Sequence, residues 1–324
     1  MSSSFSRRDF IAGLGAIAAA TALPKNILGN AAPELLYPPT DLSYFCRPVT
    51  PAPGNISFGY AAITWNGNDT QAIRDIAEVG FKGIQLRTSV LPEFESRPAA
   101  LRELLAANNL KFTAFSSGGI RIAPGTEADE IAKHVRNATF VRDAGGMYLQ
   151  VTDSARTKDR KPTADDFKQL GEVMNEIAKR VTDLGVPLGY HNHMNSLGEA
   201  PDEVDRIMDA TDPRYVKFEL DIAHYQQGGG DPAKAIRKYR DRLLFLHIKD
   251  VESPVPGDAT HPYRFVELGR GKVDLAGVFA ALKDVKFRGW AVVELDAVPD
   301  QTRTPKESAL ISKKYLEEKL KLTI

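Results

Sequence analysis

Four of the six histidines in this chain lie in short apolar segments, and three of the four segments of this kind carry carboxylates. These segments are residues 190–193, 218–224, 246–250 and 292–296. Imidazole and carboxylate groups bind divalent metals, and the same groups move protons in catalysis. The clustering therefore indicates metal-dependent chemistry, provided that the elements carrying these segments bring them together.

Short apolar runs alternate with longer amphipathic segments from residue 56 onward, which is typical of βα units and a parallel sheet. The expected strands are 56–65, 83–87, 111–115, 147–152, 187–193, 216–221, 243–249 and 290–295. The helices expected after them are 70–79, 99–108, 128–144, 164–184, 201–210, 232–239, 274–282 and 306–322. This count predicts a single-domain (β/α)8 TIM barrel. A doubly wound sheet would need a G-x-G-x-x-G turn after its first strand, and residues 65–68 do not fit that pattern.

The chain begins with a segment that predicts export. Arg7 and Arg8 precede a stretch rich in alanine, glycine and leucine at residues 12–23, which is typical of a twin-arginine signal. That stretch of about a dozen residues is shorter than the roughly 20 needed to span a bilayer. We therefore expect a signal peptide at 1–32, a proline-rich arm at 33–54 and the barrel at 55–324. The mature protein should be periplasmic, without stable membrane insertion.

Composition excludes several classes of partner and site. The chain has 42 basic and 42 acidic side chains, so its lack of net charge argues against binding to nucleic acid. The single cysteine, Cys46, cannot form an intrachain disulfide or a multi-thiolate metal site. The sequence leaves open whether the chain forms a homo-oligomer.

In a TIM barrel the active site lies at the C-terminal ends of the strands, where the four segments end. Strand alternation places His191, Asp221, His247 and Glu294 at the barrel mouth, on four successive strands. Each alone would be read as an isolated polar group that caps a strand. Together, two imidazoles and two carboxylates predict a site for Mn, Co, Fe or Zn, with Mg the less suited ion.

Further residues are candidates for acid–base chemistry around this site. His224 could contact substrate or move a proton, and His193 and Glu219 could orient the metal ligands. Lys249 could polarise a substrate oxygen, or act as an acid or base if its pKa is lowered; the alternative is a salt bridge to Glu219 or Asp250. We expect His134 and His261 to be structural.

Several motifs match a known family in order and spacing. They are the Tyr-His-Asn-His run at 190–193, Asp221-x-x-His224, the His-Ile-Lys-Asp run at 247–250, residues 268–274 and Val293-Glu294. From residue 56 to the C-terminus the chain resembles the xylose isomerase-like barrels, or sugar phosphate isomerase/epimerases, which include inosose dehydratases, ketose 3-epimerases and keto-glycoside lyases. The family typically holds its metal by Glu, Asp, His and Glu. Asp221, His247 and Glu294 match this set, whereas His191 stands at the position of the first glutamate.

This departure affects the chemistry that the resemblance implies. In epimerases of the family, two metal-bound carboxylates act as bases on opposite faces of the reacting carbon. Here only Glu294 matches one of these two carboxylates. Abstraction of a proton beside a carbonyl followed by elimination needs one base and one acid, which His193, His224 or Lys249 could supply. We therefore expect a lyase or dehydratase, with an isomerase or epimerase as the alternative.

Export favours a non-phosphorylated keto-sugar or keto-glycoside, because sugar phosphates are mainly cytoplasmic. Residues 269–272 could grip an anion or form a plain turn. A non-catalytic periplasmic carbohydrate-binding protein is the alternative of another class. A nuclease of the endonuclease IV type would need more metal ligands than this chain offers. Loops 116–126, 153–162 and 251–265 are expected to decide substrate choice.

Overall fold

The computed structural model describes residues 56–154, 156–157, 159–255 and 262–324. The expected signal at 1–32, the proline-rich arm at 33–54 with Cys46, and His261 lie outside the described residues. Among the described helices, none combines the length and the apolar character that crossing a membrane would require.

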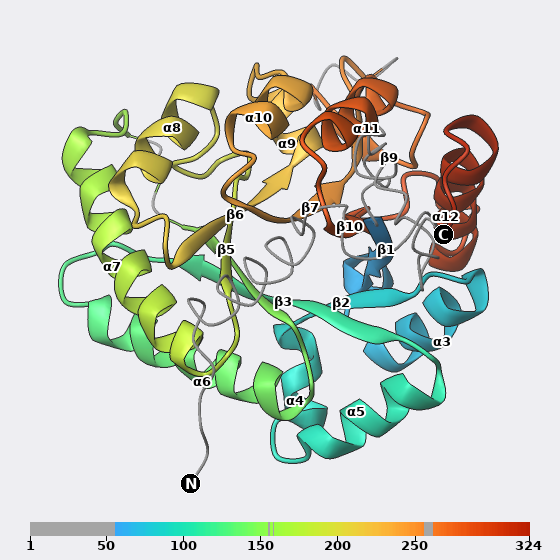
Figure 1. The fold of residues 1–324 in the computed structure, drawn as a ribbon, viewed down its shortest axis with the longest axis horizontal. Coiled ribbons are helices and arrows are strands. Elements are labelled where there is room, and N and C mark those ends of the chain that lie inside the picture. The colour runs from blue at the N-terminus through green and yellow to red at the C-terminus, as the bar shows by residue number, and fades with distance from the viewer. Residues whose placement is uncertain (1–55, 155, 158, 256–261) are drawn as a thin grey trace, which may run out of the picture. The chain divides into compact units, whose positions relative to one another are not determined.

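A closed barrel of eight parallel strands is the centre of the described part of the chain, in the order β1-β10-β7-β6-β5-β4-β3-β2. Its strands are β1 (Ile56–Ala61), β2 (Gly83–Arg87), β3 (Lys111–Ile120), β4 (Tyr148–Asp153), β5 (Leu188–His191), β6 (Val216–Asp221), β7 (Leu243–Ile248) and β10 (Gly289–Val293). The long helices surround the strands as an outer ring (Figure 1). They are α3 (Asp69–Val79), α5 (Pro98–Ala107), α6 (Glu127–Asp143), α7 (Ala164–Asp183), α8 (Pro201–Ala210), α10 (Pro232–Lys238), α11 (Leu275–Asp284) and α12 (Pro305–Lys314). The predicted (β/α)8 TIM barrel is confirmed.

Helix α7 shows how local sequence sets these elements. Its apolar residues recur every three or four positions and are buried, while the rest of the helix is largely polar. At its start the Asp166 carboxylate accepts a hydrogen bond of 2.7 Å from the Thr163 backbone N–H. Past its end Gly185 has a φ of 79°, which a residue with a side chain adopts only at a cost.

The largest errors in the predicted strand ends are in the first and third strands. The first strand stops at Ala61, and residues 62–65 form the 3-10 helix η1 (Ala62–Trp65) instead of continuing it. The third strand runs on to Ile120, so the first half of the expected loop 116–126 belongs to the sheet. Its register against β4 is irregular between Ser116 and Gly119, where Gly118 takes a φ of 85°. This glycine lets the strand resume pairing after an interruption.

Other differences lie at the C-terminal ends of the strands. The fifth strand ends at His191, so His193 stands in the following loop. The expected loop 251–265 contains a two-stranded antiparallel pair, β8 (Asp250–Glu252) and β9 (Arg264–Val266). The last helix ends at Lys314 and continues as the π-helical turn η3 (Tyr315–Lys319). Three further short helices were not predicted: η2 (Thr88–Val90), α4 (Leu91–Phe94) and α9 (Ile222–Gln227).

Candidate metal centre

The four predicted ligands meet at the C-terminal ends of neighbouring strands. His191 and Asp221 end β5 and β6, His247 lies near the end of β7, and Glu294 follows β10. One nitrogen or oxygen atom from each lies within 4.8 Å of the others, and all four residues are buried. Parallel strands bring their ends to one edge of the barrel, which is why residues more than a hundred positions apart converge.

Several buried atoms at this point lack a hydrogen-bond partner in the described part of the chain. They are Nδ1 of His191, both carboxylate oxygens of Glu219, Oδ2 of Asp221 and Nδ1 of His247. The His247 Nδ1 atom lies 3.0 Å from Oε2 of Glu294 and 3.6 Å from Oδ2 of Asp221. Each unpartnered buried polar group costs about 1–3 kcal/mol. A divalent cation held by His191, Asp221, His247 and Glu294 would satisfy several of these atoms, so the four side chains fit a metal.

Two glutamines, which the sequence analysis missed, orient His247. Oε1 of Gln85, on β2, lies 2.8 Å from Nε2 of His247, and Nε2 of Gln85 donates to Oε1 of Gln150, on β4, at 2.9 Å. An amide oxygen only accepts, so Nε2 of His247 carries a proton, and Nδ1 is the nitrogen that can bind a metal once its own proton is displaced. Nδ1 is thereby directed at the carboxylates, as a metal ligand requires.

Asp221 divides its two oxygens between a helix and the candidate centre. Its Oδ1 accepts hydrogen bonds from the backbone N–H groups of Ala223 (2.9 Å) and His224 (2.8 Å) at the start of α9. The other oxygen faces His247. The amide of Asn192 accepts from the Asp221 N–H at 3.0 Å and donates to its carbonyl at 3.2 Å, which ties the ends of β5 and β6 together.

Lys249 lies fully buried beside the carboxylates. Its Nζ is 2.6 Å from Oδ1 of Asp296 and 3.1 Å from Oε2 of Glu294. Among the described ion pairs of Lys249, the alternative expectation of a bridge to Glu219 or Asp250 is not found. Burial lowers the pKa of Lys249, but Asp296, Glu294 and Asp221 outweigh it and raise that pKa above its usual value. The lowered pKa considered from the sequence is therefore not favoured, and the ammonium form persists.

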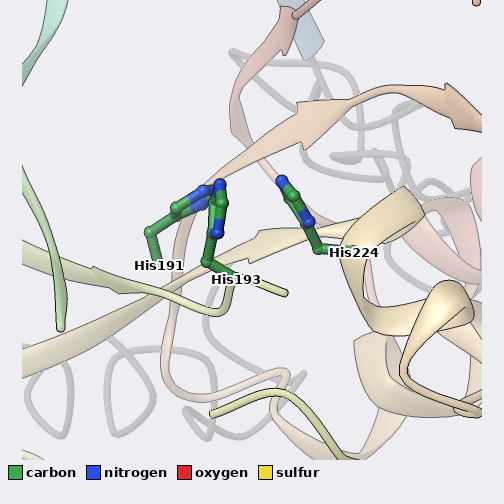
Figure 2. Close-up of side chains that lie close together, drawn as sticks. All are labelled: His191, His193 and His224. Atoms are coloured by element: carbon green, nitrogen blue, oxygen red, sulfur yellow. The ribbon is translucent and has the colours of Figure 1, made fainter. Parts of the chain in front are cut away.

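Three histidine rings gather at the mouth of the barrel, as Figure 2 shows for His191, His193 and His224. The centroids of the His193 and His224 rings are 3.9 Å apart. Nδ1 of His193 lies 2.7 Å from the carbonyl oxygen of Met194, so this nitrogen carries the proton and Nε2 keeps its lone pair. Burial, with Lys249 nearby, holds the pKa of His224 well below its usual value, so this ring is neutral.

A cavity of about 510 Å³ opens beside the centre. His191, His193 and Glu294 line it, together with polar side chains from other strands and loops, among them Gln85, Arg87, Gln150, Arg156 and Asp296. The volume and the polar lining suit a small hydrophilic molecule.

The segment 269–272 binds the carboxylate of Asp250 through its backbone N–H groups. The backbone N–H groups of Gly269 and Gly271 both donate to Oδ2 of Asp250 at 2.9 Å, and that of Val273 donates to Oδ1 at 3.0 Å. A side chain at position 271 would collide with this carboxylate. Of the two readings, the turn is the one that the contacts support.

His134, which we expected to be structural, lies away from the candidate metal centre. His134 is fully buried on α6, and its Nδ1 lies 2.6 Å from Oγ of Ser117 on β3. Asn137 also donates to this hydroxyl at 2.8 Å. These contacts tie the helix to the strand that it covers.

Comparison with known proteins shows the family to which the chain belongs. The model of the xylose isomerase-like TIM barrel family matches residues 73–318. The chain belongs to this family. A similar relative, the inosose dehydratase of Lacticaseibacillus casei, is 27% identical over 295 residues, covering 81% of this chain and 96% of the relative.

Two solved structures share the barrel. The IolI protein with a bound zinc atom superposes with a TM-score of 0.68 at 19% identity, covering 81% of this chain and 97% of that one. A sugar phosphate isomerase/epimerase from Parabacteroides distasonis gives a TM-score of 0.63 at 19% identity, covering 87% and 98%. These likenesses concern the fold.

Proposed function

We propose that this protein is a divalent-metal-dependent enzyme that removes the proton beside the carbonyl of a non-phosphorylated keto-sugar or keto-glycoside and then eliminates a neighbouring hydroxyl or alkoxyl group. The observation that carries this proposal is the ring of buried, unpartnered ligand atoms beside a polar cavity. His191, Asp221, His247 and Glu294 would hold the metal. When bound, a Mn, Co, Fe or Zn ion supplies a Lewis acid that polarises the carbonyl and acidifies the adjacent C–H bond.

Glu294 is the candidate base. Burial raises its pKa, but His247 and Lys249 outweigh burial and hold that pKa well below its usual value, so the side chain is ionised and carries no proton of its own. It also lines the cavity, where a substrate would lie. The ammonium of Lys249, 3.1 Å away, offsets the charge of this carboxylate.

His193 is the candidate acid for the leaving group. Its ring lines the cavity and is half-buried, and its Nδ1 is bonded to the Met194 carbonyl, so Nε2 is the nitrogen left to pass a proton to the leaving group. His224 packs against that ring and accepts a hydrogen bond of 3.2 Å from the Met194 N–H. This arrangement suits His224 to hold the His193 ring in place, and its lowered pKa leaves it neutral, without an extra proton to donate.

The comparisons support dehydratase chemistry, and they also support the alternative, an isomerase or epimerase. The relative from Lacticaseibacillus casei is an inosose dehydratase, an enzyme whose name describes loss of water from a keto-sugar. The structure from Parabacteroides distasonis is a sugar phosphate isomerase/epimerase, which supports isomerisation or epimerisation at the same site as the second candidate.

The test uses metal-loaded protein, a 3-keto-glycoside and deuterated water. We expect release of the aglycone, detected by mass spectrometry, and no release by a Glu294→Gln variant. A deuterated isomer that retains its leaving group would contradict elimination and favour the isomerase. Full activity of Glu294→Gln would contradict its role as the base.

We also propose that the protein acts in the periplasm after export by the twin-arginine route. The support is the sequence of residues 1–32. Replacing both Arg7 and Arg8 by lysine should retain the protein in the cytoplasmic fraction of the host. Unchanged recovery in the periplasmic fraction would contradict this route.

A further inference from the structure

We propose that Arg87 binds a carboxylate of the substrate, so that the enzyme acts on an acidic keto-sugar or keto-glycoside. The inference rests on the proposed function and narrows its substrate class. Arg87 lines the cavity but is not one of the four candidate metal ligands.

The strand order puts Arg87 across the barrel from the candidate metal centre. Strands β5, β6, β7 and β10, which carry or directly precede the four ligands, are neighbours in the closed barrel. Strands β1 to β4 form its other half, and Arg87 is the last residue of β2. A molecule that fills the cavity therefore meets the metal ligands on one side and Arg87 on the other.

Strand geometry sets how far Arg87 lies beyond the centre. Gln85 precedes it by two residues on β2, so both side chains point to the same side of the strand. Oε1 of Gln85 lies 2.8 Å from Nε2 of His247, a candidate metal ligand. Two residues of a strand span about 6.6 Å, so Arg87 begins about that far above the level of this contact. This reach suits a substituent several bonds away from a carbonyl held at the metal.

The guanidinium of Arg87 has no hydrogen bond or ion pair within the part of the chain that the structure describes. Arg156, which also lines the cavity, differs: its Nε donates to the Ser196 carbonyl at 2.5 Å, and its charge pairs with Glu203. Arg87 does attract the buried Asp69, but burial raises the pKa of Asp69 more than this attraction lowers it, as expected of charges that are not in contact. An ionised group on the substrate would give Arg87 the partner that it lacks.

Neutral groups next to Arg87 leave room for a carboxylate. Ser116 is the register partner of Arg87 across β2 and β3, and its hydroxyl can donate a hydrogen bond. Gly118 also lines the cavity, and open space lies where a side chain at that position would begin. A guanidinium donates two parallel hydrogen bonds to a carboxylate, which is a stronger contact than the one it makes with an uncharged hydroxyl. The geometry and the charge of this wall therefore favour a carboxylate.

The rival explanation is that Arg87 binds solvent or an uncharged sugar hydroxyl. Arg87 is exposed, so its burial does not decide between these explanations. Two sugars that differ only in one carboxylate do decide, because only a carboxylate subsite discriminates between them through Arg87.

The experiment compares methyl 3-keto-β-D-glucuronide with methyl 3-keto-β-D-glucoside, which has a hydroxymethyl group in place of the carboxylate. The full chain is loaded with Mn²⁺ for measurement of kcat/KM, and binding of both sugars to the metal-free chain is measured by titration calorimetry. Arg87→Gln is compared with Arg74→Gln, the same change at an exposed arginine on α3 that is not among the described cavity residues. Arg87→Lys keeps the charge without the paired donors.

We expect wild type and Arg74→Gln to prefer the glucuronide by roughly 10–100-fold in kcat/KM, the size of a hydrogen-bonded charge pair. Arg87→Gln should bring this ratio close to one, and Arg87→Lys should give an intermediate ratio. Equal use of the two sugars by wild type, or a preference that persists in Arg87→Gln, would overturn the inference while leaving the proposed function in place.

The binding measurement separates failure of this inference from failure of the proposed function. If the metal-loaded chain converts neither sugar, the proposed function fails. Tighter binding of the glucuronide that is lost in Arg87→Gln would still support the carboxylate subsite, and equal binding of the two sugars would overturn it. Methyl 3-keto-β-D-glucoside 6-phosphate is the third ligand, and binding of this phosphate more tightly than the glucuronide would overturn the assignment to a carboxylate.

Discussion

Replacing Lys249 by methionine should destabilise the metal-free protein, because it removes one side of a buried ion pair. Methionine keeps much of the length and apolar volume of the lysine side chain, so the change isolates the ammonium. Lys249 is fully buried, and its Nζ lies 2.6 Å from Asp296 and 3.1 Å from Glu294. Without it, Asp296 loses its ion-pair partner, and Glu294 keeps only His247, whose Nδ1 lies 3.0 Å away.

The size of the loss follows from how much water can reach each partner. Breaking a buried pair from one side costs roughly 3–5 kcal/mol. The Asp296 side chain is 37% exposed and can be hydrated after the change, whereas that of Glu294 is 9% exposed and cannot. We therefore expect a loss near the lower limit, about 3 kcal/mol in the free energy of unfolding, or a fall in Tm of roughly 6–12 °C.

The assay is thermal unfolding followed by circular dichroism, with and without a saturating divalent metal. Lys272→Met is the matched control, because Lys272 is exposed on the loop after β9 and its replacement should leave Tm close to that of wild type. The loss for Lys249→Met should shrink when metal is bound, since the cation then partners Glu294. A variant as stable as wild type without metal would refute the ionised pair.

Further predictions concern the groups around the metal. Gln85→Leu should weaken metal binding about 10–100-fold by freeing the His247 ring, while Gln85→Glu, which keeps an acceptor for Nε2–H, should bind nearly as well; equal binding by all three proteins in equilibrium dialysis would contradict the orienting role. Asp221→Asn should retain the cap of α9 and a near-native Tm but lose the metal, as measured by elemental analysis, and a full metal content would count against Asp221 as a ligand. Burial lowers the pKa of His247, but Glu219 and Glu294 outweigh it and raise that pKa well above its usual value in the metal-free protein. Its stabilising contribution is therefore complete below a pH of about 6.5 and lost as pH rises through the folded-state pKa, so the Tm of the metal-free protein should fall from neutral to alkaline pH while metal binding tightens. A metal affinity that does not change between pH 6 and 8, measured by titration calorimetry, would be inconsistent with proton displacement.

Sequence periodicity was sufficient to predict the barrel and to place the candidate ligands at strand ends. The pattern worked because each ligand directly ends or follows an apolar run, as His191 and Asp221 do, and because all strands of a parallel barrel end on the same side. The predicted strand ends were wrong where the backbone conformation does not depend on the pattern of apolar and polar side chains. At Gly118 the conformation of one glycine allows β3 to continue, and that cannot be read from apolar spacing.

The contacts of the residues around the candidate metal centre were harder to predict than the identity of its four ligands. Gln85 and Gln150 lie on strands two and four, and a glutamine inside a strand forms no recognisable motif. Their contact with His247 depends on strand register and tilt across the barrel interior, which a single sequence does not encode locally. Lys249 was identified as a candidate, but its pairing with Asp296 depended on where the chain turns after β10.

One oxygen of Asp221 caps α9 and the other faces the candidate metal centre, so few residue types can replace aspartate at this position. Asparagine would retain the acceptor for the α9 backbone but would bring an uncharged amide to the ion. Glutamate would retain the charge, but its longer side chain is a poor N-cap. Aspartate satisfies both requirements with one short carboxylate. Among descendants of this sequence that keep the chemistry, we expect position 221 to be invariant, and divergence there to mark lineages that have abandoned it.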